Sequence, residues 1–361
     1  MGWLVSWLSG LARRREIVAP VLGVSAAALV ACAMVFLGAP AAQANVVFPP
    51  WTGDPPWAGV ACPSATTCVA VGDGATVSAI RTGDGGATWV AQDVPGGEAL
   101  AAVACPSVVR CQAVGQRGFL GTTNGGQTWQ TESFSGPADL QAVSCFSAEI
   151  CEAAGGEAIY RTTDGGKIWN DQGFFDGYSD LYGISCPSAD FCEAVGDNTN
   201  QAGAVLRTTD GGKKWTAQSL LGGGFSTIFY AVSCPNVTEC VLVGDYNPDG
   251  DASAGVVMRT ANGGQSWDLT SESQGAENLY GVSCPNVSDC EAVGSSVSGP
   301  VAVGSTNGGV SWSGQTLPAE VGNLSAVACR SGARCAAVGS YGVNALGVAV
   351  VTANGGASWD L

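Results

Sequence analysis

The sequence contains no histidine, which excludes Ser-His-Asp and Cys-His catalysis and every metal site that needs an imidazole ligand. Positive charge is also scarce, because 14 Lys and Arg stand against 30 Asp and Glu, a formal net charge of −16. This balance argues against a nucleic-acid partner, whose phosphates need Lys and Arg for neutralisation. No segment after residue 45 sustains an apolar period of 3.6 residues, so few helices are expected there.

The first 44 residues have the features of an export signal. Arg13, Arg14 and Arg15 precede an apolar run over residues 17–38, and Ala42-Gln43-Ala44 forms a small-residue cleavage site. We interpret residues 1–44 as a signal peptide; an uncleaved membrane anchor and a lipoprotein modified at Cys32 are the alternatives. All three predict a secreted or cell-surface protein that contacts a membrane only through this N-terminal segment.

Two motifs alternate seven times in residues 58–361, after a short N-terminal segment at 45–57. The first motif is C-x5-C, and its pairs are Cys62/Cys68, Cys105/Cys111, Cys145/Cys151, Cys186/Cys192, Cys234/Cys240, Cys284/Cys290 and Cys329/Cys335. The second is the box [ST]-x-[DN]-G-G-x-x-W. Its Asp or Asn and its Trp are Asp84 and Trp89, Asn124 and Trp129, Asp164 and Trp169, Asp210 and Trp215, Asn262 and Trp267, Asn307 and Trp312, and Asn354 and Trp359. One repeat therefore occupies about 40 to 50 residues.

The repeat is typical of a propeller blade. In the fourth repeat, apolar runs bounded by Gly, Asp and Pro predict four strands at 181–186, 192–196, 204–208 and 214–218. Four strands repeated radially predict an all-β fold, a seven-bladed β-propeller of four-stranded antiparallel blades. We also expect residues 46–48 to pair beside the last blade and cover its edge.

The repeated residues have structural explanations. Cysteines six apart flank a hairpin between the first and second strands, so seven local disulfides are expected in an exported protein. In the box, Asp or Asn accepts hydrogen bonds from the turn, the glycines take positive φ, and the tryptophan packs between strands. Arg81, Arg161, Arg207 and Arg259 share one position before the box and are interpreted as surface residues of the third strand.

Thr82–Trp89 (T-G-D-G-G-A-T-W) and Thr122–Trp129 (T-T-N-G-G-Q-T-W) resemble the Asp-box, or BNR, repeat of the sialidase-like superfamily. Blade length and the T-T-D-G-G-x-x-W form are most similar to the photosystem II stability and assembly factors, which are seven-bladed propellers. The C-P-S-x3-C-x-A-V-G hairpin resembles repeats of exported actinobacterial proteins. No sialidase residue can be carried over, since the R-I-P motif and the arginine triad are missing, and the acidic chain lacks the basic patch of the assembly factors.

Function is expected on the face where the repeats differ. The first-to-second and third-to-fourth strand connections share one face, which is uniform, whereas the other connections vary in length and form the variable face. Three aromatic residues there, Tyr182, Tyr230 and Tyr280, are interpreted as inter-blade packing or as binding residues. The candidate binding residues are Phe174, Phe175, Asp176, Tyr178, Asp180, Asp197 and Tyr246.

One loop on this face fits the opening of a calcium loop. Asp245, Asn247, Asp249 and Asp251 alternate in D-x-[DN]-x-[DN]-G form, but the usual glutamate at position twelve is replaced by Val256. The loop predicts either a plain hairpin connection or a weak calcium site, and no other cofactor is expected. For the whole chain we predict non-catalytic binding of a protein or carbohydrate; the alternative is a glycoside hydrolase that uses paired carboxylates.

Overall fold

The computed structural model describes residues 47–48, 56–74, 77–97, 99–136, 139–175, 177–200, 202–218, 220, 226–247, 253–272, 275–342 and 346–361. The chain divides into two units, residues 1–44 and 45–361, and all of the described residues belong to the second. The predicted export signal therefore lies outside the described residues. In the part that is described, no helix is both long and apolar enough to span a membrane.

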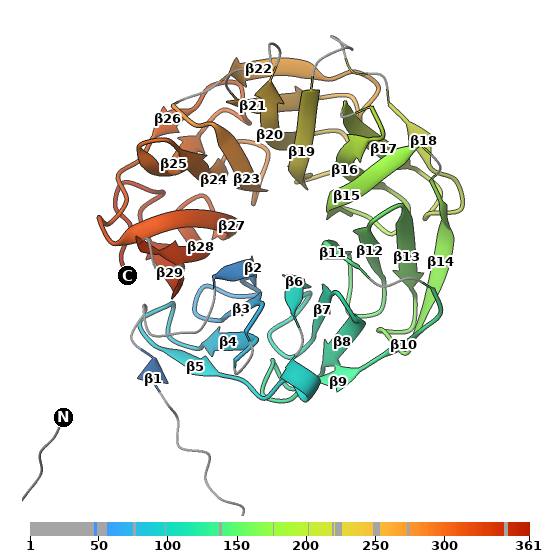
Figure 1. Ribbon diagram of the computed structural model, residues 1–361, viewed down its shortest axis with the longest axis horizontal. Helices are drawn as coiled ribbons and strands as arrows, with labels where there is room; N and C mark the ends of the chain where they lie inside the picture. The colour runs from blue at the N-terminus through green and yellow to red at the C-terminus, as the bar shows by residue number, and fades with distance from the viewer. Residues whose placement is uncertain are drawn as a thin grey trace, which may run out of the picture. The chain divides into compact units, whose positions relative to one another are not determined.

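Seven sheets form a ring, and in each of them the strand that leads to the first cysteine of the C-x5-C pair lies nearest the centre (Figure 1). Blade 1 comprises β2 (Trp57–Ala61), β3 (Cys68–Gly72), β4 (Ala79–Thr82) and β5 (Trp89–Ala91). Blade 2 comprises β6 (Leu100–Ala104), β7 (Cys111–Gly115), β8 (Gly118–Thr122) and β9 (Gln130–Thr131). Blade 3 comprises β11 (Ala142–Cys145), β12 (Cys151–Gly155), β13 (Ala158–Thr162) and β14 (Ile168–Phe174). A short 3-10 turn, Pro95–Gly97, links the first two blades, and β10 (Ser133–Phe134) adds to β14 in parallel.

The fourth blade confirms the predicted strand positions. It comprises β15 (Tyr178–Ser185), β16 (Cys192–Asn198), β17 (Gly203–Thr208) and β18 (Thr216–Ala217). Blade 5 comprises β19 (Ser226–Ser233), β20 (Cys240–Asn247), β21 (Ala254–Thr260) and β22 (Asp268–Glu272), and blade 6 comprises β23 (Asn278–Ser283), β24 (Cys290–Ser296), β25 (Gly299–Ser305) and β26 (Ser313–Gly314). Blade 7 comprises β27 (Val321–Ser331), β28 (Arg334–Tyr341) and β29 (Leu346–Thr352). In blade 7 a single bridge, Val351 to Asp360, stands where the other blades have a fourth strand.

Blade 1 closes the ring against blade 7. Trp57 and Val60 of β2 share a buried cluster with Ala336 and Val338 of β28. The expectation that residues 46–48 pair with the last blade is wrong, because β1 (Val47–Phe48) pairs antiparallel with β5 on the outer edge of blade 1. The reason is that β5 offers the free backbone edge of a complete blade at that point, and an added strand satisfies it.

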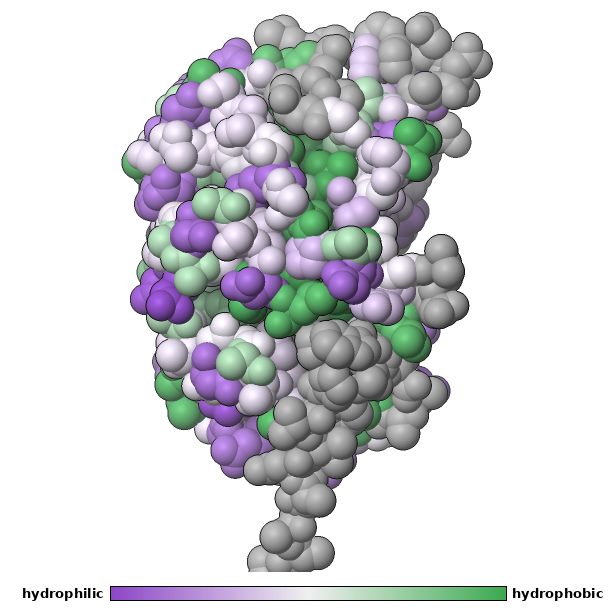
Figure 2. Space-filling model, turned by 90° about the vertical axis from the view of Figure 1, so that its left-hand side faces the viewer, coloured by the Kyte–Doolittle hydropathy of each residue, from purple (hydrophilic) through white to green (hydrophobic). Residues whose placement is uncertain are grey.

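The hydrophobic core consists of separate layers, one between each pair of neighbouring blades, and each box tryptophan belongs to or packs against one of them. Trp169 and Trp267 are among the largest fully buried side chains. At the outer edge of the ring hydrophilic and hydrophobic side chains are interspersed (Figure 2). The propeller is therefore stabilised mainly by burial of apolar surface between blades.

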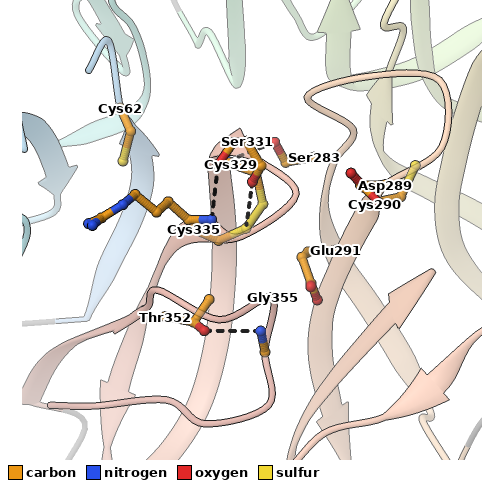
Figure 3. The surroundings of a disulfide bond; sticks show 12 residues. Cys62, Ser283, Asp289, Cys290, Glu291, Cys329, Ser331, Cys335, Thr352 and Gly355 are labelled. Carbon is orange, nitrogen blue, oxygen red and sulfur yellow. Dashed lines mark hydrogen bonds between the residues drawn. A yellow bond between two sulfur atoms is a disulfide. The ribbon is translucent and has the colours of Figure 1, made fainter. Parts of the chain in front are cut away.

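All seven C-x5-C pairs form disulfides within their own hairpins, as predicted. Figure 3 shows the Cys329–Cys335 hairpin, where the Cys329 backbone N–H donates to the Ser283 hydroxyl of blade 6 at 2.9 Å. The same serine-to-cysteine bond links blade 3 to 4, 4 to 5 and 5 to 6. Seven disulfides are typical of a protein from an oxidising, extracellular environment.

Candidate functional site

The face that carries the disulfide hairpins also carries the box turns, and we call it the disulfide face. In blade 3, Gly165 N donates to the Glu149 carbonyl of the hairpin, and the equivalent glycine does so in every blade. Asp164 accepts from Ile168 N and Thr162 Oγ1, and these hydrogen bonds hold its pKa below the ordinary value. The box carboxylates and amides are thus engaged within their own turns.

Two of the strand-three arginines, Arg161 and Arg207, are not surface residues, contrary to our interpretation. The Arg161 guanidinium pairs with Glu152 of its own blade and donates to the Ala189 carbonyl of blade 4, and Arg207 donates to the Gly263 carbonyl of blade 5. Residues that are directly paired in antiparallel strands face the same side of the sheet. Arg161 is paired with the buried Glu152, so its side chain also faces the neighbouring blade. Arg161 and Arg207 therefore link neighbouring blades, whereas Arg259 pairs with Glu239 of its own blade.

Blades 2 and 6 have glycine at this position, Gly121 and Gly304, and a pocket at each. The pockets measure about 370 Å³ and about 400 Å³ and lie between blades 2 and 3 and between blades 6 and 7. Glu132 fills the space above Gly121, and Gln315 fills the space above Gly304. A side chain from the same blade therefore partly occupies each pocket. An arginine in place of the glycine would displace this side chain.

On the variable face, the inner strands of blades 4 to 6 share a β-bulge four residues before their cysteine. In β15 the register shifts between Leu181 and Gly183, which leaves Tyr182 as the extra residue. Tyr230 in β19 and Tyr280 in β23 occupy the same position. The next residue is Gly or Ala because neighbouring inner strands approach closely; a Cβ on Gly183 would lie 3.0 Å from Ala231 Cα.

The three bulge tyrosines contact one another across blades. The ring centroids of Tyr182 and Tyr230 lie 5.8 Å apart, and those of Tyr230 and Tyr280 lie 5.2 Å apart, with interplanar angles of 53° and 58°. All three side chains are only partly buried. They form a continuous aromatic surface on three successive inner strands, which we call the tyrosine arc.

Carboxylates border the tyrosine arc. Asp197 and Asp245 each follow the last glycine of the second strand, and Asp197 accepts the backbone N–H of Asp180 at 3.2 Å. The Tyr230 hydroxyl lies close enough to Asp245, and the Tyr182 hydroxyl close enough to Asp180, for the negative charge of each carboxylate to raise the pKa of the tyrosine beside it. In blade 6 the equivalent residue is Ser295, which bonds to the Tyr280 hydroxyl at 3.4 Å.

Burial raises the pKa of Asp180, Asp197 and Asp245, and the neighbouring Asp139 and Asp180 carboxylates add to the rise for Asp180 and Asp197 respectively. Burial, and then Asp180 and Asp197, raise the pKa of Tyr182 to about 12. The shifts indicate negative charges that are crowded and incompletely solvated. One carboxylate oxygen of Asp245 is buried without a hydrogen-bond partner among the described residues.

Basic side chains are unevenly distributed between the two faces of the ring. Among the residues described on the variable face, Arg117 is the one basic side chain; the other described Lys and Arg lie in hairpins, in boxes or beside the boxes. Described carboxylates of the variable face are Asp73, Asp139, Glu157, Asp180, Asp197, Asp245, Glu277 and Glu320. The variable face is therefore strongly anionic.

The predicted binding residues divide into three groups. Asp180 and Asp197 are brought together as partners across β15 and β16. Phe175 and Tyr178 pack against the core between blades 3 and 4, with Phe175 in edge contact with Trp215, and Tyr246 packs against the core between blades 4 and 5. Phe174 ends β14, but its side chain lies outside the described residues, as does all of Asp176.

The calcium prediction is left open. Asp245 and Asn247 end β20, whereas Asp249 and Asp251 lie outside the described residues. Within the described part of the chain, no group of three or more Asp, Glu or Cys side chains is arranged to hold a metal ion. The site that sequence reasoning undervalued is the tyrosine arc. Its signal is an aromatic residue four positions before the first cysteine of three successive repeats.

Comparisons with known proteins bear on the fold. No family model and no curated protein sequence matches the chain. Among solved structures it is similar to YCF48 from Cyanidioschyzon merolae, with TM-score 0.61 and 16% identity over 84% of this chain and 97% of that one. YCF48 bound to D1 peptide matches with TM-score 0.61 and 15% identity over 85% of this chain and 96% of the other. The GH74 xyloglucanase from Xanthomonas campestris matches with TM-score 0.64 and 14% identity, over 87% of this chain and 55% of that enzyme. At these identities the likeness establishes the propeller fold alone.

Proposed function

We propose that this protein is an exported, non-catalytic binding or scaffold protein that engages a protein or carbohydrate partner on the variable face. The tyrosine arc carries the proposal. Partly buried aromatic rings from three blades, bordered by carboxylates, form a surface that combines apolar contact area with polar groups at its edge. Tyr is enriched in binding surfaces because it offers both.

Two further observations support this proposal. YCF48, a propeller of the same fold, has a structure bound to a peptide, which is a precedent for peptide binding on this scaffold. The seven disulfides support export, since such bonds persist in oxidising compartments. Export would proceed through residues 1–44, with the secreted or cell-surface form beginning at Asn45.

The test is a binding screen of the disulfide-bonded Asn45–Leu361 protein against glycan and peptide arrays. Each ligand found is tested again with Tyr230→Ala and with Phe146→Ala, which removes an exposed ring from the disulfide face. We expect loss of binding with Tyr230→Ala alone. Ligands that bind both variants equally, or that are lost only with Phe146→Ala, would contradict a site on the variable face.

A second candidate function rests on the Asp180–Asp197 pair. Glycoside hydrolysis needs two carboxyl groups near one bond, one of them with a raised pKa, and here both partners have a raised pKa. Sugar released from plant or bacterial polysaccharides, and lost in Asp197→Asn, would support the hydrolase. Absence of released sugar from every glycan that the protein binds would leave the binding function alone.

A further inference from the structure

We propose that the tyrosine arc binds a cationic side chain, Lys or Arg, presented by a peptide segment of a partner protein. This inference rests on the proposed function and specifies its ligand. The site comprises the rings of Tyr182, Tyr230 and Tyr280 and the carboxylates beside them.

The rings supply the first part of the argument. A cation is attracted to the face of an aromatic ring, and several rings around one position add their effects. Tyr230 lies between the other two rings at 5.8 Å and 5.2 Å and is tilted to both, so the three faces differ in direction along one curved surface. On the inner strands of blades 1, 2 and 7 the corresponding bulge residues are small, Ala58, Ala101 and Ser325. The aromatic surface is thus confined to one side of the ring.

The carboxylates supply the second part. Tyr182 and Tyr230 lie beside Asp180 and Asp245, and the backbone N–H of Asp180 in turn bonds to Asp197 at 3.2 Å. A cation held over these rings would also lie beside the carboxylates, and this combination favours a cation over the neutral hydroxyl groups of a sugar. One oxygen of the Asp245 carboxylate is buried without a hydrogen-bond partner among the described residues, so its negative charge is poorly compensated, and an ammonium or guanidinium group over the neighbouring rings would supply the missing positive charge.

The charge of the surrounding face supplies the third part. The carboxylates of the variable face outnumber its one described basic residue, Arg117, which lies on blade 2 and therefore away from the arc on blades 4 to 6. Such a field attracts a basic segment over a distance of about one Debye length, roughly 8–10 Å, and repels an acidic one. A basic peptide is therefore the occupant that the charge, the rings and the unpaired oxygen all favour.

The experiment measures binding of three labelled peptides of Gly and Ser by fluorescence anisotropy. One carries Arg and Lys, one carries Gln at the same positions, and one carries Glu. The protein variants are Tyr230→Ala and Asp245→Asn at the site, with Phe146→Ala and Asp190→Asn as matched exposed controls on the disulfide face. We expect the basic peptide alone to bind, with about tenfold weaker affinity in each site variant and no change in the controls.

Each other outcome overturns the inference in a recognisable way. Equal binding of the Gln peptide, or a Tyr230-dependent glycan, would leave the proposed function standing with a neutral ligand. Basic-peptide binding that is unaffected by Tyr230→Ala would reduce the effect to general charge attraction. Self-association in sedimentation that is abolished by the site variants would assign the surface to a second copy of this chain. Circular dichroism and intact disulfides establish that each variant is folded.

Discussion

The indole nitrogen of Trp359 donates a hydrogen bond to Gln315 of the preceding blade, with 2.7 Å between Nε1 and Oε1. Trp169 donates in the same way to Glu132 at 2.8 Å. In both cases the preceding blade has glycine at the third-strand position that is arginine in blades 1, 3, 4 and 5. Behind the arginines of blades 1, 3 and 4, the indole nitrogens of Trp129, Trp215 and Trp267 have no partner among the described residues. One position of the repeat therefore influences how the next blade is attached.

Replacement of Gln315 by Ala should destabilise the propeller. The change leaves the Trp359 indole N–H without an acceptor and removes the amide that donates to the Glu291 carboxylate at 2.8 Å. The expected loss in the free energy of unfolding is about 1–3 kcal/mol, measured by chemical denaturation. The matched control is Gln218→Ala, whose side chain bonds only to the backbone of its own strand among the described residues. Equal losses in the two variants would contradict the inter-blade role.

The unfolding free energy should fall as pH rises from about 4.5 to 8. Burial raises the pKa of Glu193 to about 8 and those of Glu132, Glu152 and Glu291 to about 7, from an ordinary value of 4.5. The folded chain then holds more protons than the unfolded chain in this window, so stability decreases with pH by on the order of 1 kcal/mol per pH unit and group. Denaturation at pH 5 and pH 8 measures the difference, and a more stable protein at pH 8 would refute it.

Glu193→Val isolates one of these groups. The variant copies blade 5, where Val241 occupies the same position against the second glycine of the next box, Gly309. We expect higher stability than wild type at pH 8 and little change at pH 5, because the ionised carboxylate is the costly form. Lower stability at both pH values would mean that Glu193 stabilises the fold by packing or by its contact with Arg207, whether or not its carboxyl group is ionised.

Removal of one disulfide should have a limited cost. Each bond closes a loop between cysteines six apart, for which chain entropy predicts a stabilisation of about 2 kcal/mol. Cys186→Ala combined with Cys192→Ala should lower the unfolding free energy by that amount. Peptide mapping of the unmodified protein checks the pairing itself; a link between different hairpins, or several free thiols, would be incompatible with the structure.

Binding of the basic peptide should weaken as pH falls. Asp180, Asp197 and Asp245 must be ionised to attract a cation, and their pKa values lie above the ordinary aspartate value of 3.8. Affinity for the basic peptide is therefore expected to be highest near pH 7 and to fall as the pH is lowered, with the fall starting before pH 3.8 is reached. The stability of the fold is expected to rise over the same range, so loss of binding would not reflect unfolding. Anisotropy titrations across this range give the trend, and Asp245→Asn should reduce it. Affinity that is constant from pH 7 to 4 would exclude a role for these carboxylates.

The fold was predictable from sequence because its determinants are local. Each Cys pair and each box fixes one turn, and the strands between them follow, as β15 to β18 illustrate. The position of Val47–Phe48 and the role of Arg161 were predicted wrongly, since both depend on which strand or blade lies alongside. The tyrosine arc is similar: Tyr182, Tyr230 and Tyr280 lie about 50 residues apart in sequence, and their contact depends on a bulge and on the packing of neighbouring blades.

The most direct test of the binding site is hydrogen–deuterium exchange of the folded protein with and without the basic peptide. The account predicts slower exchange in β15, β19 and β23, on the inner edge of blades 4 to 6, and no change in the disulfide hairpins or box turns. Slower exchange confined to the disulfide face, or no change in these three strands at saturating peptide, would contradict it.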